Sequence, residues 1–243
     1  MTPTPPPFAP RLNDLGQPIG DPLPHWSGAA RPPRAPLDGR HCRIEPLDPD
    51  RHGADLFAAV TEPGDPGLWT YMTQGPFAAE AEMRAWLEAA AQGEDPLFHA
   101  ILDGDGRAAG VAAYLRIQPE HGVIEVGNIV LAPRLQRTPA ATEAMVLMMG
   151  RAFDDLGYRR YEWKCDALNI RSRHAAQRLG FTYDGLFRQA VVYKGRNRDT
   201  AWYAILDRDW LALKPRFEAW LDPANFDADG NQKTRLDVRN RRW

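Results

Sequence analysis

The chain has 243 residues, 44% of them apolar and 26% charged, a balance typical of a soluble globular protein that buries a core. Its net charge of -2 provides no global field that would favour nucleic acid or a membrane surface as a partner. The 2 cysteines cannot build a disulfide framework, and the 6 histidines show no metal spacing, so we expect no metal. The first residues lack a secretory apolar core and no apolar run is long enough to span a bilayer, so we expect a cytoplasmic protein.

The N-terminal segment is rich in proline, with half of the 22 prolines before residue 37. A helix or central strand does not tolerate that density, because each proline lacks an amide donor and fixes φ. We therefore expect residues 1–38 to form an arm that is extended or disordered. Leu15, Ile19, Leu23 and Trp26 leave open whether this arm docks on the body.

From about Arg40 onward, strand and helix signals alternate along the chain. The order β-α-α-β-β-β-α-β-α-β-β predicts a mixed α/β sheet with helices on its faces over 39–210. A last helix, kinked or stopped near Pro215, and a polar tail are expected over 211–243. In chain order we expect a strand at 41–47, helices at 52–62 and 78–91, two strands around the DGDG turn at 103–106, a strand at 122–133, a helix at 138–157, a strand at 159–168, a helix at 169–180 and a strand pair over 181–207.

The start of the helix at 138–157 has the features of an anion site. Thr138 is placed as the N-cap and Pro139 as the first helical residue. The amides of Ala140 and Ala141 would then be free, with the positive end of the helix dipole behind them and Arg137 beside them. Phosphate is a common ligand of such a helix terminus. A plain capped helix explains the same spacing, so spacing alone leaves both interpretations open.

This segment resembles the acetyl-CoA-binding motif Q/R-x-x-G-x-G/A of the GCN5-related N-acetyltransferase (GNAT) superfamily, with Gln136 first and Ala141 last. The RimJ/RimL-like ribosomal-protein N-acetyltransferase branch is more similar still, because its strand ends in proline and its helix continues A-T-E-A. The chain departs from the motif at the glycines, where it has Arg137 and Pro139, and Pro139 has no amide to donate. The resemblance implies that acetyl-CoA is bound by Ile129, Leu131, Gln136, Arg137, Thr138, Ala140 and Ala141.

A second block agrees with the same superfamily. The family carries N-x-x-S at the start of a later helix and then L-G-F, which correspond to Asn169, Ser172 and 179–181 here. The resemblance implies that Asn169 bonds the pantetheine arm and that Ser172 donates a proton to the leaving thiolate. Asn169 as an N-cap with Ser172 as its solvated neighbour is the structural alternative, and both roles can hold together.

Glu125 lies eleven residues before Gln136, where several family members carry a general-base glutamate. A carboxylate in a run of Val and Ile is costly to bury without a partner, and burial can raise its pKa toward neutrality, which suits deprotonation of an ammonium group. A structural carboxylate is the alternative. Asn128 is placed on the opposite face by strand alternation, to polarise the acceptor or hold the strands apart. Cys165 is expected to be a buried, inert thiol.

The acceptor pocket in this fold lies between the loop that joins the first two helices and the last strand pair. Trp69 and Tyr71 occupy that loop, Arg188 lies on the late strands, and Glu162 and Asp166 would add negative charge. Aromatic rings with carboxylates suit a cationic amine, although aromatic residues in a loop often only pack.

The resemblance covers about 39–210 and implies an N-acetyltransferase that moves the acetyl group of acetyl-CoA directly to a primary amine of a small molecule or a protein N-terminus. The alternative is a CoA-binding sensor or interaction module without turnover, which the altered phosphate loop motivates. The identity of the acceptor, the acyl donor beyond a CoA thioester, and the choice between monomer and homodimer stay open.

Overall fold

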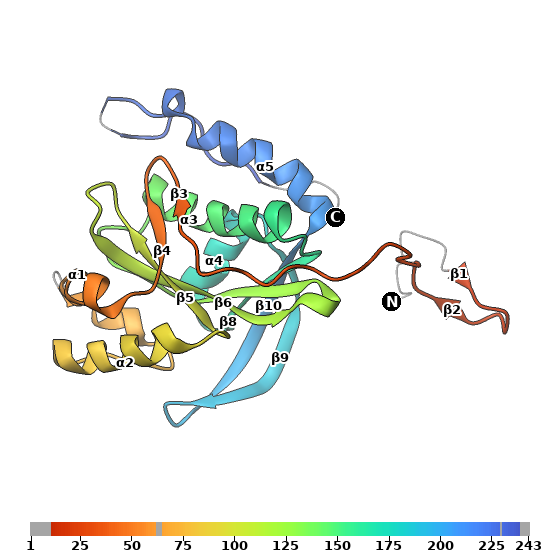
Figure 1. Cartoon of the computed structure of the whole chain (residues 1–243), viewed down its shortest axis with the longest axis horizontal. Helices are drawn as coiled ribbons and strands as arrows, with labels where there is room; N and C mark the ends of the chain where they lie inside the picture. Colours follow the sequence, from red (N-terminus) through yellow and green to blue (C-terminus); the bar gives the residue numbers. More distant parts are fainter. Residues whose placement is uncertain (1–10, 62–64, 229, 239–243) are drawn as a thin grey trace.

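The computed structural model describes residues 11–61, 65–228 and 230–238, and its centre is an eight-stranded sheet (Figure 1). The strand order is β3-β4-β5-β6-β7-β8-β10-β9. Neighbouring strands are antiparallel except β7 and β8, which are parallel. The strands are β3 (Leu37–Asp38), β4 (Arg43–Pro46), β5 (Leu97–Leu102), β6 (Ala108–Gln118), β7 (Val123–Leu131), β8 (Arg160–Asp166), β9 (Thr182–Tyr193) and β10 (Arg196–Leu206).

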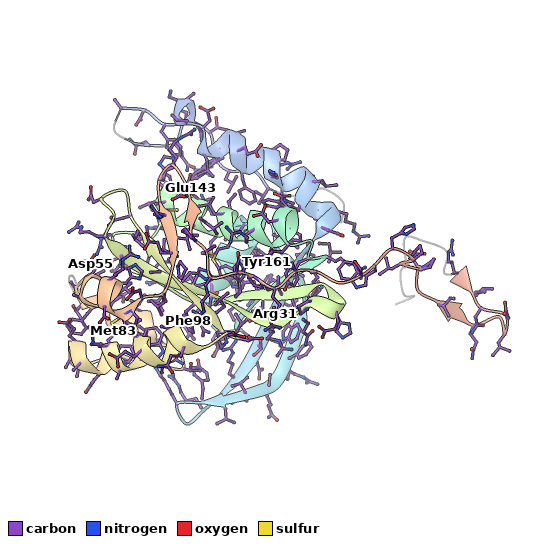
Figure 2. The ribbon with its side chains drawn as sticks, viewed as in Figure 1. Arg31, Asp55, Met83, Phe98, Glu143 and Tyr161 are labelled. Atoms are coloured by element: carbon purple, nitrogen blue, oxygen red, sulfur yellow. The ribbon has the colours of Figure 1, made fainter. Side chains whose placement is uncertain are left out.

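Helices cover both faces of the sheet and enclose two hydrophobic cores. Met83 of α2 and Phe98 of β5 belong to the core under α1 and α2, and Tyr161 of β8 belongs to the core under α3, α4 and α5 (Figure 2). The predicted element order and the mixed α/β fold are confirmed. The helices are α1 (Pro49–Thr61), α2 (Glu80–Gln92), α3 (Pro139–Gly150) continued by a π-helical turn (Arg151–Asp155), α4 (Ile170–Arg178) and α5 (Asp207–Leu221), with short 3-10 turns at Pro66–Trp69, Pro119–His121 and Pro223–Asn225. In the described ranges, no helix has the length and apolar character needed to cross a membrane.

Local sequence signals explain most of the element ends. The DGDG segment forms the β5–β6 turn, where the Asp103 carboxylate accepts the amides of Asp105 and Arg107. Thr138 caps α3 as predicted, because its Oγ1 accepts the amide of Ala141 at 3.2 Å. These contacts are short-range, so they follow directly from neighbouring residues.

We expected a kink or a stop at Pro215; the last helix, α5, continues through this proline to Leu221, so the stop is wrong. A proline inside a helix costs about 3 kcal/mol. The side chains of Trp210, Leu213 and Phe217, on both sides of the proline, are buried in the core beneath α5. Their burial offsets the cost, because each large apolar side chain contributes about 1.5–3 kcal/mol.

Of the four apolar side chains singled out in the N-terminal arm, Trp26 contacts the body, and Ala29 and Leu37 of the arm also pack against the core. Trp26 donates from its indole Nε1 to the carbonyl of Glu120 at 2.9 Å, and the guanidinium of Arg159 lies 5.4 Å from its ring centre. Leu15 and Ile19 remain 81% and 49% exposed on a small hairpin that extends away from the body (Figure 1). The hairpin strands are β1 (Arg11–Leu12) and β2 (Pro18–Ile19).

Glu143 of α3 fixes the turn between β3 and β4. Its carboxylate accepts the backbone amides of Arg40, His41 and Cys42 at 2.9, 2.6 and 3.0 Å (Figure 2 labels Glu143). Gly39 lies so close that a Cβ there would be 2.4 Å from the carboxylate. Glu143 is therefore a structural residue within the A-T-E-A segment.

His99 of β5 makes folding sensitive to acid. It is 2% exposed, its Nδ1 has no hydrogen-bond partner among the described residues, and burial lowers its pKa to about 4. Because the unfolded chain binds this proton more tightly, the stabilising effect of a neutral His99 is full above about pH 6.5 and is lost as the pH falls toward 4. The loss reaches about 3 kcal/mol. His99→Phe is expected to flatten the wild-type decline in urea unfolding measured between pH 7 and 4.5, whereas parallel declines in both proteins would contradict the assignment.

Candidate active site

The parallel strands β7 and β8 separate part-way along their length. They pair from Val123 with Arg160 as far as Val126 with Trp163. Beyond this point β8 continues to Asp166 paired only with β10 among the described residues, and the rest of β7 has no strand partner on its β8 side there. The Leu131 carbonyl accepts the Gln136 side chain. The other backbone groups of β7 on that side are available to an extended ligand, because backbone donors and acceptors require partners.

A bulge breaks β7 just after the separation. Asn128 and Ile129 lie opposite Ala112 of β6 where the register shifts, and Asn128 has a φ of +50°. Strand alternation, which we used to assign the face of Asn128, therefore fails at this residue. Ile129 and Leu131, the predicted cofactor contacts, lie on the stretch of β7 that has no strand partner on its β8 side, and both are half-buried.

The helix start after β7 offers fewer free donors than predicted. The amide of Ala141 is not free, because the hydroxyl oxygen of its own N-cap Thr138 accepts it. That hydroxyl in turn donates to the carbonyl of Leu135 at 2.7 Å. Ala140 keeps its place among the first-turn amides, which have no acceptor within the helix. The arrangement can hold one anionic group at the dipole end, with Ala140 as the nearest first-turn donor.

Gln136 and Arg137 form the tight part of this loop. The Gln136 side chain donates from Nε2 to the carbonyl of Leu131 at 2.8 Å, which ties the loop to the end of β7. Arg137 is exposed and has a φ of +64°, a conformation that favours glycine. The motif glycine expected after Gln136 thus corresponds to a left-handed position that arginine occupies here.

Arg137→Gly is expected to stabilise the protein by about 1 kcal/mol, because glycine adopts the left-handed conformation without the clash of a Cβ. Urea unfolding at neutral pH measures the change. Arg137→Ala is the matched control, since it removes the same cation and keeps the Cβ. Equal stability of the glycine and alanine variants would contradict a strained backbone at this residue.

Asn169 and Ser172 meet at the point where the strands separate. Asn169 caps α4, and its Oδ1 accepts the amide of Ser172 at 3.1 Å, as the structural alternative required. Ser172 is more than a solvated neighbour, because its Oγ accepts the indole Nε1–H of Trp163 at 2.9 Å. Cys165 is 5% exposed, hydrogen-bonds the same serine, and has a pKa raised by burial. The serine hydroxyl is thereby held beside Trp163, the last residue of β8 that pairs with β7.

Glu125 lies one residue before the separation and is 5% exposed. Lys164 Nζ lies 2.7 Å from its Oε2, and Arg116 Nε lies 3.6 Å away. Burial raises the pKa of Glu125, and the attraction of Lys164 only partly offsets it. A Cβ at Gly127 would lie 3.0 Å from the Leu115 side chain, whereas its distance of 3.5 Å to Glu125 Oε1 is an ordinary contact.

The two other predicted carboxylates are buried beside this pair. Burial alone would raise the pKa of Glu162, but hydrogen bonds from Lys164 and Arg160 lower it. Asp166 accepts the hydroxyl of Tyr193 at 2.8 Å. The sheet surface next to the strand separation therefore carries three buried carboxylates, each with a hydrogen-bond donor.

The α1–α2 loop and the β9–β10 turn are joined by one ammonium group. Lys194 Nζ donates to the carbonyls of Trp69, Gln74 and Gly75 at 2.8, 3.1 and 2.7 Å. The two predicted walls of the acceptor pocket thus contact each other. The irregular stretch of the β9–β10 ribbon borders an open cavity of about 530 Å³ lined by Arg188, Gln189, Asn197 and Asp199.

The two loop aromatics have different environments. Trp69 is 4% exposed and packs edge-on against Phe77 and Trp86, so its ring belongs to the core and does not line an open wall. Tyr71 is half-buried, and its hydroxyl donates to the carbonyl of Leu168 just beyond β8 at 3.2 Å. Tyr71 therefore connects the loop to the segment that leads into α4.

Known proteins share both the sequence and the fold. Residues 42–182, more than half of the chain, match the family model described as an acetyltransferase (GNAT) domain. A GCN5-related N-acetyltransferase from Brucella melitensis is 47% identical, with a TM-score of 0.85 over 88% of this chain and 97% of that one. The chain belongs to the GNAT acetyltransferase family. A probable GNAT-family acetyltransferase from Chromobacterium violaceum is 38% identical, with a TM-score of 0.74 over 80% of this chain and 97% of that one.

Among curated proteins, this GNAT chain is 24% identical over 156 residues to the uncharacterized N-acetyltransferase YnaD of Bacillus subtilis, which covers 64% of this chain and 90% of that protein. The chain is an N-acetyltransferase, and the GNAT fold implies acetyl-CoA as its acyl donor. The hydrogen-bonding groups present fit acetyl-CoA. The side of β7 that β8 leaves without a strand partner suits the amide groups of the pantetheine arm, and the N-terminus of α3 suits a phosphate.

Lys164 contacts two of the predicted carboxylates, and sequence reasoning missed it. Its position two residues after Glu162 places both on one face of β8, which is a visible signal. The contact with Glu125 depends on the parallel register of β7 and β8, and a single sequence does not contain that register.

Proposed function

We propose that Glu125 is the general base and Ser172 the proton donor of acetyl transfer to a primary amine. The observation that carries this proposal is the placement of both groups about the last β7–β8 pair. Ser172 accepts a hydrogen bond from Trp163. Val126, the β7 partner of Trp163, belongs to the core under α3, α4 and α5. Glu125 precedes Val126, so its side chain points to the opposite face. A thioester threaded between the strands would have its sulfur near Ser172 and its carbonyl open to an amine arriving from the Glu125 face.

The reaction needs no covalent enzyme intermediate. Glu125 takes a proton from the ammonium form of the acceptor, directly or through water, and the amine nitrogen forms a C–N bond with the thioester carbonyl carbon. Backbone amides near Ile129 would stabilise the oxyanion that develops on the carbonyl oxygen. The C–S bond then breaks, and Ser172 protonates the leaving thiolate. The attacking nitrogen loses its second proton, which returns to Ser172 through solvent, and Glu125 passes its proton to solvent, so the products are the amide, the free CoA thiol and one proton. Asn128 would orient the acceptor beside this centre.

A cationic amine suits the charges on the acceptor side. Glu125, Glu162 and Asp166 are buried carboxylates there, and Tyr71 and Arg188 border the same region in our proposal. The acceptor class is the primary amine of a small molecule or a protein N-terminus. Solved structures of ribosomal-protein acetyltransferases share the fold at 15% and 20% identity, which is a likeness of fold alone, so the RimJ/RimL-like branch stays part of the proposal. We also propose action in the cytoplasm as a monomer or homodimer.

A CoA-binding module without turnover is the second candidate. It is favoured by the phosphate loop, in which Pro139 has no amide and the amide of Ala141 is already bonded to Thr138. Fewer backbone donors then remain for the pyrophosphate than the family motif provides.

Calorimetric titration of the purified chain with acetyl-CoA tests the proposal, with CoA and ATP as controls. We expect micromolar affinity for acetyl-CoA, and release of free CoA when primary amines and peptides with free N-termini are added. Binding without CoA release from any of these amines would support the second candidate. No binding at millimolar acetyl-CoA would contradict both.

A further inference from the structure

We propose that Lys164 is a positioning residue that keeps Glu125 ionised and directed along the sheet surface, and that Glu162 competes with Glu125 for the same ammonium group. The catalytic meaning of this arrangement rests on the proposed function of Glu125 as the base. The arrangement itself is a property of the free protein.

The ammonium group lies between two carboxylates on neighbouring strands. Glu125 and Glu162 are direct partners in the parallel register, and Lys164 follows two residues after Glu162 on the same face. Lys164 Nζ lies 2.7 Å from Glu125 Oε2 and 2.6 Å from Glu162 Oε2. All three side chains are 7% exposed. Two adjacent buried carboxylates repel each other, so the shared cation is what lets both remain charged.

Trp202, which is half-buried, and Phe187, which is 51% exposed, cover one side of this cluster. Trp202 lies opposite Lys164 in the β8–β10 register, and its ring centre is 3.9 Å from Lys164 Nζ. Phe187 of β9 stacks on Trp202 with ring centres 4.3 Å apart and planes inclined by 19°. A cation–π contact in a dry environment strengthens the attraction between the ammonium group and the carboxylates.

The two carboxylates are not equivalent. Glu162 has a second close cation, because Arg160 Nε lies 2.6 Å from its Oε1. The other cation near Glu125 is Arg116 of β6, which is 3.6 Å away and 54% exposed, so solvent screens it. The negative charge of Glu125 is therefore balanced mainly by Lys164, whereas that of Glu162 is balanced by both Lys164 and Arg160. When the surroundings of two neighbouring acids move their pKa values apart, one acid can hold a proton while the other stays charged, so the two can take distinct roles.

The directions of the two pKa shifts agree with this asymmetry. Burial raises the pKa of Glu125, whereas the bonds from Lys164 and Arg160 outweigh burial and lower that of Glu162. Of the two, Glu125 is the group whose pKa lies above its ordinary value, because burial outweighs the attraction of Lys164. A charge-neutral residue in place of Lys164 would leave Glu125 without its main counter-charge.

Titration of ¹³C-labelled glutamate carboxyl groups by NMR tests the proposal on the full chain without any acceptor. The Glu125 signal is assigned by its absence from the Glu125→Gln variant. In Lys164→Met, which keeps the side-chain length, we expect the Glu125 midpoint to rise by about one pH unit or more. In Glu162→Gln, which leaves Lys164 to Glu125 alone, we expect the midpoint to fall. Arg116→Met, which removes the screened cation, is the control and should change the midpoint little.

Glu125 midpoints that shift in opposite directions in the two variants support the proposal. A general loss of packing around the site would shift the midpoint in the same direction in both variants. Shifts of the same sign, or no shift in either variant, overturn it. If Lys164→Met does not fold, the downward shift in Glu162→Gln decides alone. The result does not depend on turnover, so a protein that passes this test and binds no acetyl-CoA would refute the proposed function and leave the charge arrangement intact.

Discussion

Glu125→Gln is expected to lower kcat/KM for amine acetylation by about 10²- to 10⁴-fold, the usual contribution of a positioned general base. Glutamine matches the size of the buried side chain and can still accept a hydrogen bond from Lys164, but it cannot take a proton. The affinity for acetyl-CoA should stay within about twofold of wild type, because Glu125 faces away from the core under α3, α4 and α5, which borders the start of α3. Release of free CoA with each amine that the wild type accepts measures the rate, and calorimetry measures the affinity.

The matched control is Glu120→Gln, since Glu120 is 66% exposed on the turn before β7 and lies outside the site. This control should keep the wild-type rate and affinity. A Glu125→Gln enzyme with more than half of the wild-type rate would exclude the base role. A variant with lost affinity as well as lost rate would indicate that Glu125 supports the strand separation instead of the chemistry.

Glu143→Ala is expected to destabilise the fold by about 3–5 kcal/mol, the largest stability effect that we predict. The carboxylate accepts the amides of Arg40, His41 and Cys42, and its removal leaves all three without their acceptor at a part-buried turn. Glu143→Gln should cost less, because its amide oxygen still accepts while its NH₂ group faces another donor. Urea unfolding at neutral pH measures both.

Gly39→Ala gives an independent view of the same contact. A Cβ at Gly39 would displace the Glu143 carboxylate and also meet the carbonyl of Cys42 at 2.9 Å, so this variant should be destabilised as well. Glu88→Ala on the exposed side of α2 is the control and should lose no more than about 0.5 kcal/mol. A loss below about 1 kcal/mol in Glu143→Ala would show that water replaces the carboxylate at these amides.

Local chemistry explains what could be predicted. Thr138 and Pro139 mark the start of α3, and Asp103 forms the β5–β6 turn, because caps and turns depend on residues a few positions apart. The two family motifs located Gln136, Asn169 and Ser172 for the same reason: the order of residues along the chain is what a motif records. Long-range packing explains why α5 does not stop at Pro215, since burial against distant elements outweighed local preference there. It also explains why Trp69 packs in the core, which is the alternative that the sequence left open for the loop aromatic residues.

By itself, the sequence determined the order of the elements and the helix start after β7, and it pointed to the carboxylates Glu125, Glu162 and Asp166. Periodicity, capping and turn formation are short-range effects, so one chain read in order contains them. Only the tertiary structure decided that Lys164 lies between Glu125 and Glu162, that Trp202 covers it, and that Ser172 meets Trp163 where β7 and β8 separate. These contacts depend on strand register, and a shift of one residue would move every side chain of a strand to its other face.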